Sequence, residues 1–136
     1  MRVSVETEQG QVPVTVMKVV GDVDASNYRD LIAAAREQYA AGARHILLDL
    51  SEVGYVGSSG LVALHSISVL VRGQQPPDPE AGWQAFRTMG RDVEAGMQQG
   101  VKLLNLQPAV ARVLDTSGMA QFFEIFTDRA AAVNAF

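Results

Sequence analysis

The stretch that decides the fold reads Asp49-Leu50-Ser51-Glu52-Val53-Gly54-Tyr55-Val56-Gly57-Ser58-Ser59-Gly60-Leu61. It follows the apolar run 45–48, which is typical of a buried strand, and it leads into an apolar helix expected to begin at Ser58. Two adjacent hydroxyls therefore lie where a strand passes into a helix N-terminus. The unpaired backbone N–H groups and the helix dipole at such a position favour a phosphate. A serine here either caps the helix or is a phosphorylation site.

The composition excludes several classes of function. The chain has 136 residues, a net charge of −4, 48% hydrophobic and 19% charged residues and no cysteine. This is the composition of one soluble globular domain, spanning 1–136. The absence of a basic cluster argues against binding nucleic acid or an anionic membrane, and the absence of cysteine excludes disulfides and thiol catalysis. No apolar run is long enough to insert into a membrane, so we expect a cytoplasmic protein.

The residues on either side of the opening stretch predict alternating strands and helices. Residues 3–5 and 12–20 are expected to form two strands around a turn at 8–10, and 44–50 a central strand. A helix capped by Ser26 or Asp24 and ended by Gly42 carries one apolar face, which comprises Tyr28, Leu31, Ile32, Ala35 and Tyr39.

The opening stretch continues as a helix over 58–71 that is apolar nearly all round. Such a helix is either deeply buried or carries a surface that binds a partner. The C-terminal part predicts a strand over 101–106, a helix over 108–115, a strand over 122–126 and a final helix capped by Asp128. The whole pattern indicates an α/β fold with a mixed sheet of about five strands, right-handed crossovers and helices mainly on one face.

Residues 73–99 interrupt this pattern as an insertion. A Pro- and Gln-rich linker is followed by Trp83 and Phe86 at helical spacing. These aromatic residues would either pack a short helix back onto the domain or provide an oligomer or partner contact, so a homodimer is one expected assembly.

Three segments, in order, carry a family resemblance: Gly21-Asp22-Val23-Asp24, the opening stretch through Ser58-Ser59-Gly60-Leu61, and Asn105-Leu106-Gln107-Pro108-Ala109-Val110 with Leu114, Gly118 and Phe122-Phe123. They resemble the GELD-type turn, the DLSxVxxxDSSGL signature and the C-terminal NxxPxV pattern of STAS domains. This is the fold of anti-sigma factor antagonists and of the cytoplasmic tails of sulphate transporters. The resemblance covers nearly everything except the insertion.

The resemblance implies a non-enzymatic anti-sigma factor antagonist in a partner-switching pathway of transcription regulation. Its partner would be an anti-sigma serine kinase of the histidine-kinase-like ATPase type, which phosphorylates the first serine, Ser58 (alternatively Ser59), and a phosphatase would reverse the modification. No cofactor or metal is implied. The expected partner-binding residues are Asp22, Asp24, Tyr55, Gly57, Ser58, Ser59, Gly60, Leu61, Val62 and His65.

Gly57 departs from the family signature, which has aspartate before the two serines. The glycine removes a carboxylate that would brace the loop and help to recruit the kinase. Ser58 as a plain helix N-cap, contributing roughly 0.5–2 kcal/mol, therefore remains open beside the phosphorylation site. The alternative function is a phosphorylation-independent STAS scaffold in a signalling or lipid-transport complex.

Other kinds of site fit the sequence poorly. The glycines at 54, 57 and 60 lack the Lys-Ser/Thr ending of a phosphate-binding loop, and Gly57–Gly60 is one residue short of a nucleophile elbow. His45 and His65 are too far apart to be a convincing ligand pair. The carboxylates of Asp22, Asp24, Asp49 and Glu52 are interpreted as turn and cap residues.

Overall fold

The protein was analysed as a computed structural model, which describes residues 1–74 and 98–136. The predicted insertion lies mostly outside the described residues, and so do Trp83 and Phe86. No helix within the described residues is both long and apolar enough to cross a membrane.

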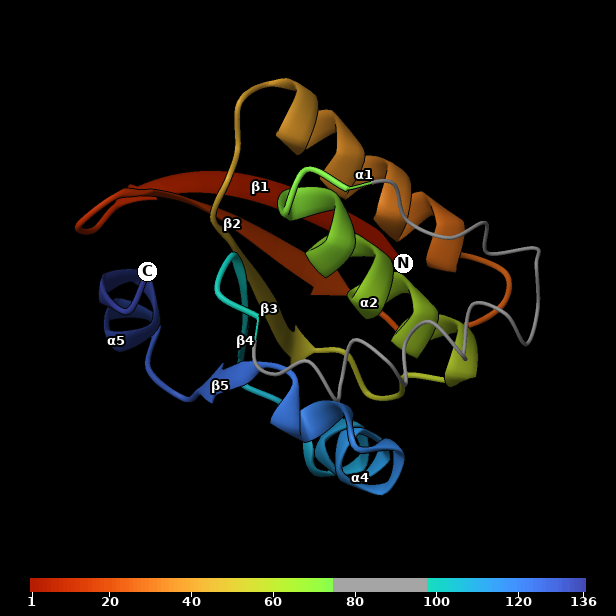
Figure 1. The fold of residues 1–136 in the computed structure, drawn as a ribbon. Helices are drawn as coiled ribbons and strands as arrows, with labels where there is room; N and C mark the ends of the chain where they lie inside the picture. Colours follow the sequence, from red (N-terminus) through yellow and green to blue (C-terminus); the bar gives the residue numbers. More distant parts are fainter. Residues whose placement is uncertain (75–97) are drawn as a thin grey trace.

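A five-stranded mixed sheet forms the centre of the fold, with the strands in the order β1-β2-β3-β4-β5 (Figure 1). β1 (Arg2–Gln9) and β2 (Pro13–Val20) are antiparallel, whereas β3 (Ile46–Glu52), β4 (Val101–Leu104) and β5 (Glu124–Phe126) continue the sheet in parallel with β2. The predicted α/β class and mixed sheet are therefore confirmed.

The helices connect the parallel strands. α1 (Tyr28–Ala40), α2 (Ser58–Val71) and α4 (Pro108–Ser117) join successive pairs of strands, while a 3-10 turn, η2 (Met119–Gln121), and α5 (Arg129–Asn134) flank β5. Because each parallel crossover moves one strand further in the same direction, crossovers of a single hand place their helices on one face. Figure 1 shows α1 and α2 side by side on that face, with α5 on the opposite side of the sheet.

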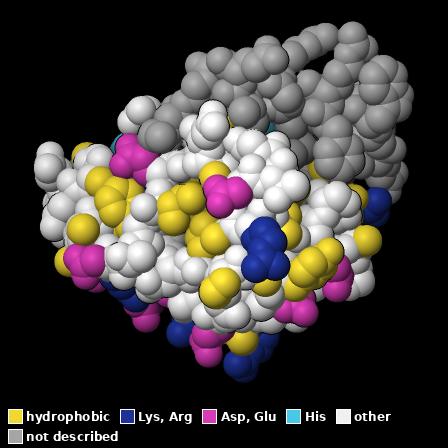
Figure 2. Space-filling view, turned by 90° about the horizontal axis from the view of Figure 1, so that it is seen from below, with side chains coloured by type: hydrophobic (Ala, Val, Ile, Leu, Met, Phe, Trp, Pro, Cys, Tyr) yellow, Lys and Arg dark blue, Asp and Glu magenta, His cyan; other side chains and the backbone are white. Residues whose placement is uncertain are grey.

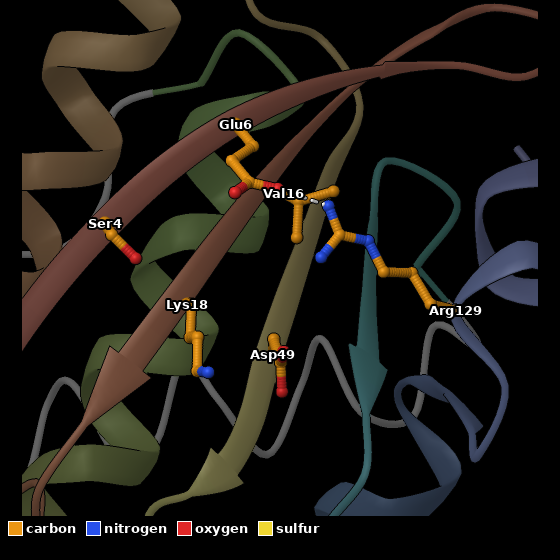
Figure 3. A pocket seen from close by; sticks show the side chains of 6 residues that line it. All are labelled: Ser4, Glu6, Val16, Lys18, Asp49 and Arg129. Carbon is orange, nitrogen blue, oxygen red and sulfur yellow. Dashed lines mark hydrogen bonds and ion pairs between the residues drawn. The ribbon is translucent and has the colours of Figure 1, made fainter.

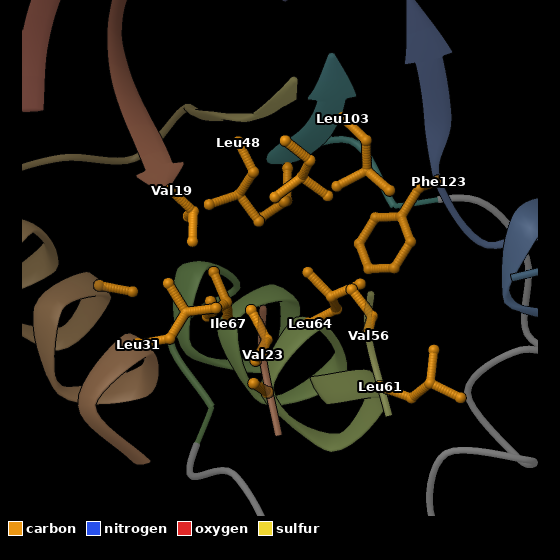
Figure 4. Close-up of a cluster of buried hydrophobic side chains, with 14 of the residues drawn as sticks. Val19, Val23, Leu31, Leu48, Val56, Leu61, Leu64, Ile67, Leu103 and Phe123 are labelled. Atoms are coloured by element: carbon orange, nitrogen blue, oxygen red, sulfur yellow. The ribbon is translucent and has the colours of Figure 1, made fainter. Parts of the chain in front are cut away.

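Two hydrophobic clusters follow from the alternation of side chains along the strands. Met17, Val19 and Leu48 point to the helix face and join α1, α2, α4 and η2 in the main core, part of which Figure 4 shows. On the opposite face, Val16 and Leu47 pack against Ala132 and Val133 of α5, as do the other members of this smaller cluster. Each face of β2 and β3 is therefore at least partly covered.

Several predicted boundaries shift. The strand predicted over 101–106 ends at Leu104, and the strand predicted over 122–126 begins only at Glu124. Phe122 and Phe123 are fully buried in the main core, and the centroids of their rings are 5.0 Å apart. Packing in the core rather than strand pairing therefore determines their position. The helix predicted to end at Asp115 continues to Ser117 and is terminated by Gly118, whose φ of +83° suits a glycine. Asp128 caps α5 as predicted, accepting a hydrogen bond from the Ala131 N–H at 2.9 Å.

Candidate functional site

The candidate site lies at the carboxyl ends of β2, β3 and β4, where three connecting loops meet. This edge is where open parallel sheets commonly bind their ligands and partners. The loop after β2 and the loop after β3 are joined by an isolated parallel bridge between Val23 and Val56. The Val23 N–H donates to Tyr55 O and the Gly57 N–H donates to Val23 O, both at 3.0 Å. The backbone on both sides of Tyr55 is therefore held by hydrogen bonds to Val23.

Side chains close the loop between β2 and α1. The Asp24 carboxylate accepts hydrogen bonds from both the N–H and the hydroxyl of Ser26, which lower the pKa of Asp24 below its ordinary value. Asn27 accepts from the Asp24 N–H at 3.0 Å and donates to Asp22 O at 2.9 Å. The prediction that Ser26 or Asp24 caps the helix was wrong: the N-cap is Asn27, because Ser26 and Asp24 bond to each other inside the preceding turn.

Gly57 and Ser58 begin α2. Gly57 is the N-cap, and Ser58 is the first helical residue, so the interpretation of Ser58 as the N-cap was wrong. The first intrahelical bond runs from the Leu61 N–H to Gly57 O, and no side chain caps this end of the helix. Ser58 is exposed, Ser59 is half-buried and Gly60 is buried. The family signature has aspartate at the position of Gly57. Aspartate is favourable at an N-cap, because its carboxylate accepts hydrogen bonds from the amides of the first turn.

Gly60 lets the first turn of α2 lie against the Val23–Val56 bridge. A Cβ on Gly60 would overlap the Val56 side chain and lie 3.3 Å from both Cγ1 and O of Val23. Any larger residue would push the first turn of α2, which begins at Ser58, away from the loop that carries Tyr55. Glycine at this position therefore permits the close approach of the first turn of α2 to Val23 and Val56.

The predicted partner-binding residues divide into surface and buried groups. Asp22, Asp24, Tyr55 and Ser58 are exposed, and 51% of the Tyr55 surface is accessible. Leu61, Val62 and His65 are buried, and the His65 ring lies 5.9 Å from the ring of Phe122 in the main core. These three side chains lie beneath the surface, and the exposed group is the part that solvent reaches.

Gln107 also belongs to this edge, although its side chain was not singled out from the sequence. It is the N-cap of α4, and its amide donates to Ser51 O at 2.9 Å, tying the loop after β4 to the end of β3. Asn105, with a φ of +56°, makes the sharp bend before it. In the sequence, only the position of Asn105 and Gln107 just before Pro108 indicated that they lie at the start of a helix.

Figure 2 views the molecule from the end where α4 and the start of α2 lie. Hydrophobic side chains form several separate groups there, with acidic and basic side chains between them. Within the described residues no group of three or more His, Cys, Asp or Glu side chains is placed to hold a metal ion. The exposed groups of this edge are suited to a protein contact of mixed apolar and polar character.

Comparisons with solved structures show the fold. An anti-sigma factor antagonist from Mycobacterium paratuberculosis superposes with a TM-score of 0.65 at 19% identity, covering 98% of this chain and 93% of that one. The Bacillus cell fate determinant SpoIIAA in its phosphorylated form gives a TM-score of 0.54 at 14% identity, covering 96% of each chain. Unphosphorylated SpoIIAA, also an anti-sigma factor antagonist, gives 0.50 at 16% identity, covering 93% of this chain and 88% of that one.

A search of curated proteins gives no match. Residues 6–76, just over half of the chain, match the model of a family described as "Mlab, STAS domain". This span includes β2, α1, β3 and all of α2, and with them the bridge between Val23 and Val56 and the two adjacent serines. The sequence match and the five-stranded fold agree, and the chain belongs to the STAS-domain family.

Proposed function

We propose that this protein is a non-enzymatic anti-sigma factor antagonist in a partner-switching pathway. In this proposal it binds an anti-sigma serine kinase of the histidine-kinase-like ATPase type through the edge around Ser58, and phosphorylation of Ser58 weakens that binding. A phosphatase would restore the binding form. The observation that carries the proposal is that Ser58 is exposed at the first position of α2, at the same edge of the sheet as the exposed Tyr55.

The position of Ser58 is suited to reversible phosphorylation. The amides of the first turn and the positive end of the helix dipole favour a phosphate, so the modified protein needs little refolding. The phosphate adds about −1.5 to −2 charges near pH 7. Because Asp22 and Asp24 already lie exposed on a loop of the same edge, the added charge would make this surface strongly acidic. An apolar or acidic partner surface would then be repelled.

A phosphotransfer assay tests the proposal. The protein is incubated with ATP and a serine kinase of the histidine-kinase-like ATPase type from the same organism, and the modified residue is mapped by mass spectrometry. We expect phosphate on Ser58, its loss in Ser58→Ala, and unchanged labelling in the matched control Ser4→Ala, whose serine is exposed on β1. In a binding assay, Ser58→Glu should weaken the complex by about tenfold or more, equivalent to at least about 1.4 kcal/mol.

The alternative is a phosphorylation-independent scaffold in a signalling or lipid-transport complex, and Gly57 favours it. The N-cap of α2 lacks the carboxylate of the family signature, and a Cβ at this position would make only ordinary contact, 3.5 Å from the Tyr55 ring. Aspartate would therefore fit, and its absence is not forced by packing. A tight kinase complex without modification of the wild type, combined with labelling of Gly57→Asp, would support the scaffold and overturn the switch.

A further inference from the structure

β1 forms one edge of the sheet, and within the described residues no strand pairs with its outer side. It is eight residues long, and residues 4–7 are all exposed. A strand edge of this length offers unpaired N–H and C=O groups to another strand. The opposite edge, β5, is only three residues long. β1 is therefore the edge better suited to pairing with another chain.

The hydrogen bonds of β2 indicate which backbone groups of β1 point outward. The Thr15 N–H donates to His45 O at 2.9 Å, so the backbone groups of Thr15 point to β3. Since this direction alternates along a strand, the groups of Val16 point to β1, where Val16 is opposite Glu6. The groups of Glu6 therefore point to β2, and those of its two neighbours point away from the sheet. By the same alternation, the outward groups of β1 include those of Val3, Val5 and Thr7.

One face of β1 carries all of its charged side chains. Glu6 and Glu8 lie on the face toward α5, where Arg129 pairs with them at 2.7 and 2.6 Å. Figure 3 shows Ser4 and Glu6 on this face, with Arg129 reaching Glu6 from the start of α5. Arg2 belongs to the same face by alternation, is exposed and forms no ion pair within the described residues. β1 therefore carries a positive charge at its start and two carboxylates, which share one cation, toward its end.

This distribution of charge is complementary to itself when two copies of β1 lie antiparallel. If Val5 is opposite Val5 of the second copy, Arg2 is opposite Glu8, and Ser4 is opposite Glu6. Opposite charges that face each other across a strand pair stabilise it, whereas like charges destabilise it. Centring the pairing on Glu6 would oppose two carboxylates, and centring it on Ser4 would shorten the paired segment. The register centred on Val5 is therefore the longest one without a like-charge pair.

The backbone and the other face of β1 fit the same register. Val5 would exchange both of its outward hydrogen bonds with Val5 of the second copy, and Val3 would do so with Thr7. Val3 is partly buried against the main core, so Val5 lies on that face by alternation. The Val5 side chain is 39% accessible, and the two copies of it would be direct neighbours across the axis. Pairing would therefore cover apolar surface as well as unpaired backbone groups.

We propose that this chain forms a symmetric homodimer in which β1 pairs antiparallel with β1 of a second copy, centred on Val5. The two sheets would then continue into one another across a twofold axis. A second copy is the partner because β1 complements itself in charge and in backbone direction. This surface differs from the oligomer contact expected at Trp83 and Phe86, which lie outside the described residues. One strand pair buries less than the about 1,200–2,000 Å² of a standard interface, so we expect a micromolar Kd.

Sedimentation velocity over a range of protein concentrations tests the dimer. The wild type should show a monomer–dimer equilibrium, and Val5→Lys, which opposes two ammonium groups at the axis, should weaken it by about tenfold or more. Ile125→Lys is the matched control, because Ile125 is 40% accessible on the other edge strand, and it should dimerise as the wild type does. Circular dichroism confirms that both variants fold. A monomeric wild type at every concentration, or equal dimerisation of the two variants, would overturn the proposal.

Cysteine crosslinking tests the register, because the chain has no cysteine of its own. Val5→Cys should give a disulfide-linked dimer under mild oxidation, since the two Cα atoms would be about 5.5 Å apart, a distance that a disulfide spans. Ser4→Cys should crosslink far less, because the two copies of Ser4 are offset along the strands. Arg2→Glu should weaken the dimer by about fivefold, since it replaces two attractive pairs with Glu8 by two repulsive ones. Preferential crosslinking at Ser4, or an Arg2→Glu dimer as tight as the wild type, would refute the pairing centred on Val5.

Discussion

Gly60 lies directly against Val56, so that a Cβ on Gly60 would overlap the valine side chain. This contact joins the first turn of α2, which begins at Ser58, to the loop after β3. Packing against Val56 therefore requires glycine at this position of the family signature. This contact and four other local interactions of the fold lead to the predictions below.

Gly60→Ala should destabilise the protein by about 1–3 kcal/mol, because the added methyl group overpacks a buried contact. Urea unfolding followed by circular dichroism measures the change. Ser59→Ala, one residue earlier in the same turn, is the matched control and should change stability by less than about 0.5 kcal/mol. An equal effect of the two substitutions would show that α2 can move away from Val56 without penalty.

Gly57→Asp should stabilise the protein by about 0.5–1 kcal/mol, since its carboxylate would cap α2 and face the positive end of the helix dipole. Gly57→Ala provides the comparison, because it adds a Cβ without an acceptor. The expected order of unfolding free energies is Asp above Gly above Ala. If Gly57→Asp were no more stable than Gly57→Ala, its side chain would not be capping the helix.

Ser26→Ala should raise the pKa of Asp24 toward its ordinary value, because the Ser26 hydroxyl and N–H are the groups that lower it. A ¹³C NMR titration of the Asp24 carboxyl carbon measures this directly. Because the folded pKa is the lower one, the associated stability is present above the unfolded pKa and disappears as the pH falls through the folded value. A titration curve unmoved by Ser26→Ala would contradict the assignment.

Arg129→Gln should loosen the start of α5, since Arg129 links it to Glu6 and Glu8 of β1. All three side chains are more than a third exposed, so we expect a loss below about 1 kcal/mol. The loss should shrink in 1 M NaCl, where screening acts over about 3 Å. A double-mutant cycle with Glu8→Gln isolates the pair, and a coupling energy that does not respond to salt would argue against an ion pair.

Lys102 is the most buried charge of the sheet among the described residues, with 1% of its side chain accessible. Its ammonium lies 3.2 Å from Glu124 and 5.0 Å from the centre of the Phe136 ring. Glu124→Gln should destabilise by about 1–3 kcal/mol, below the 3–5 kcal/mol of a fully buried pair because Glu124 is 34% accessible.

Lys102→Met tests the same pair from the other side. An apolar side chain of similar length should be nearly neutral or stabilising in urea unfolding, because it removes the need to desolvate the ammonium. Adding Glu124→Gln to Lys102→Met should then have little further effect. A large additional loss in this double variant would show that Glu124 acts through contacts other than Lys102.

The sequence alone determined the α/β class, the order of the elements, the family and the place of the two serines at the start of α2. These features are encoded locally, by the period of apolar residues and by the glycine-serine signature. The apolar face of α1 and the Asp128 cap were predicted for the same reason. The positions of the caps of α1 and α2 were not, because neighbouring polar residues compete for the same backbone groups.

Only the tertiary structure decided which charges lie together. Asp49 was interpreted as a turn or cap residue, but it lies inside β3, nearly buried on the face opposite α1 and α2. Its surroundings come from β1, β2 and α5, which are separated from it by up to about eighty residues of sequence. Such neighbours depend on strand order and register, which are set by long-range pairing. The two serines could therefore be found by reading the chain, whereas the neighbours of Asp49 could be identified only in the folded sheet.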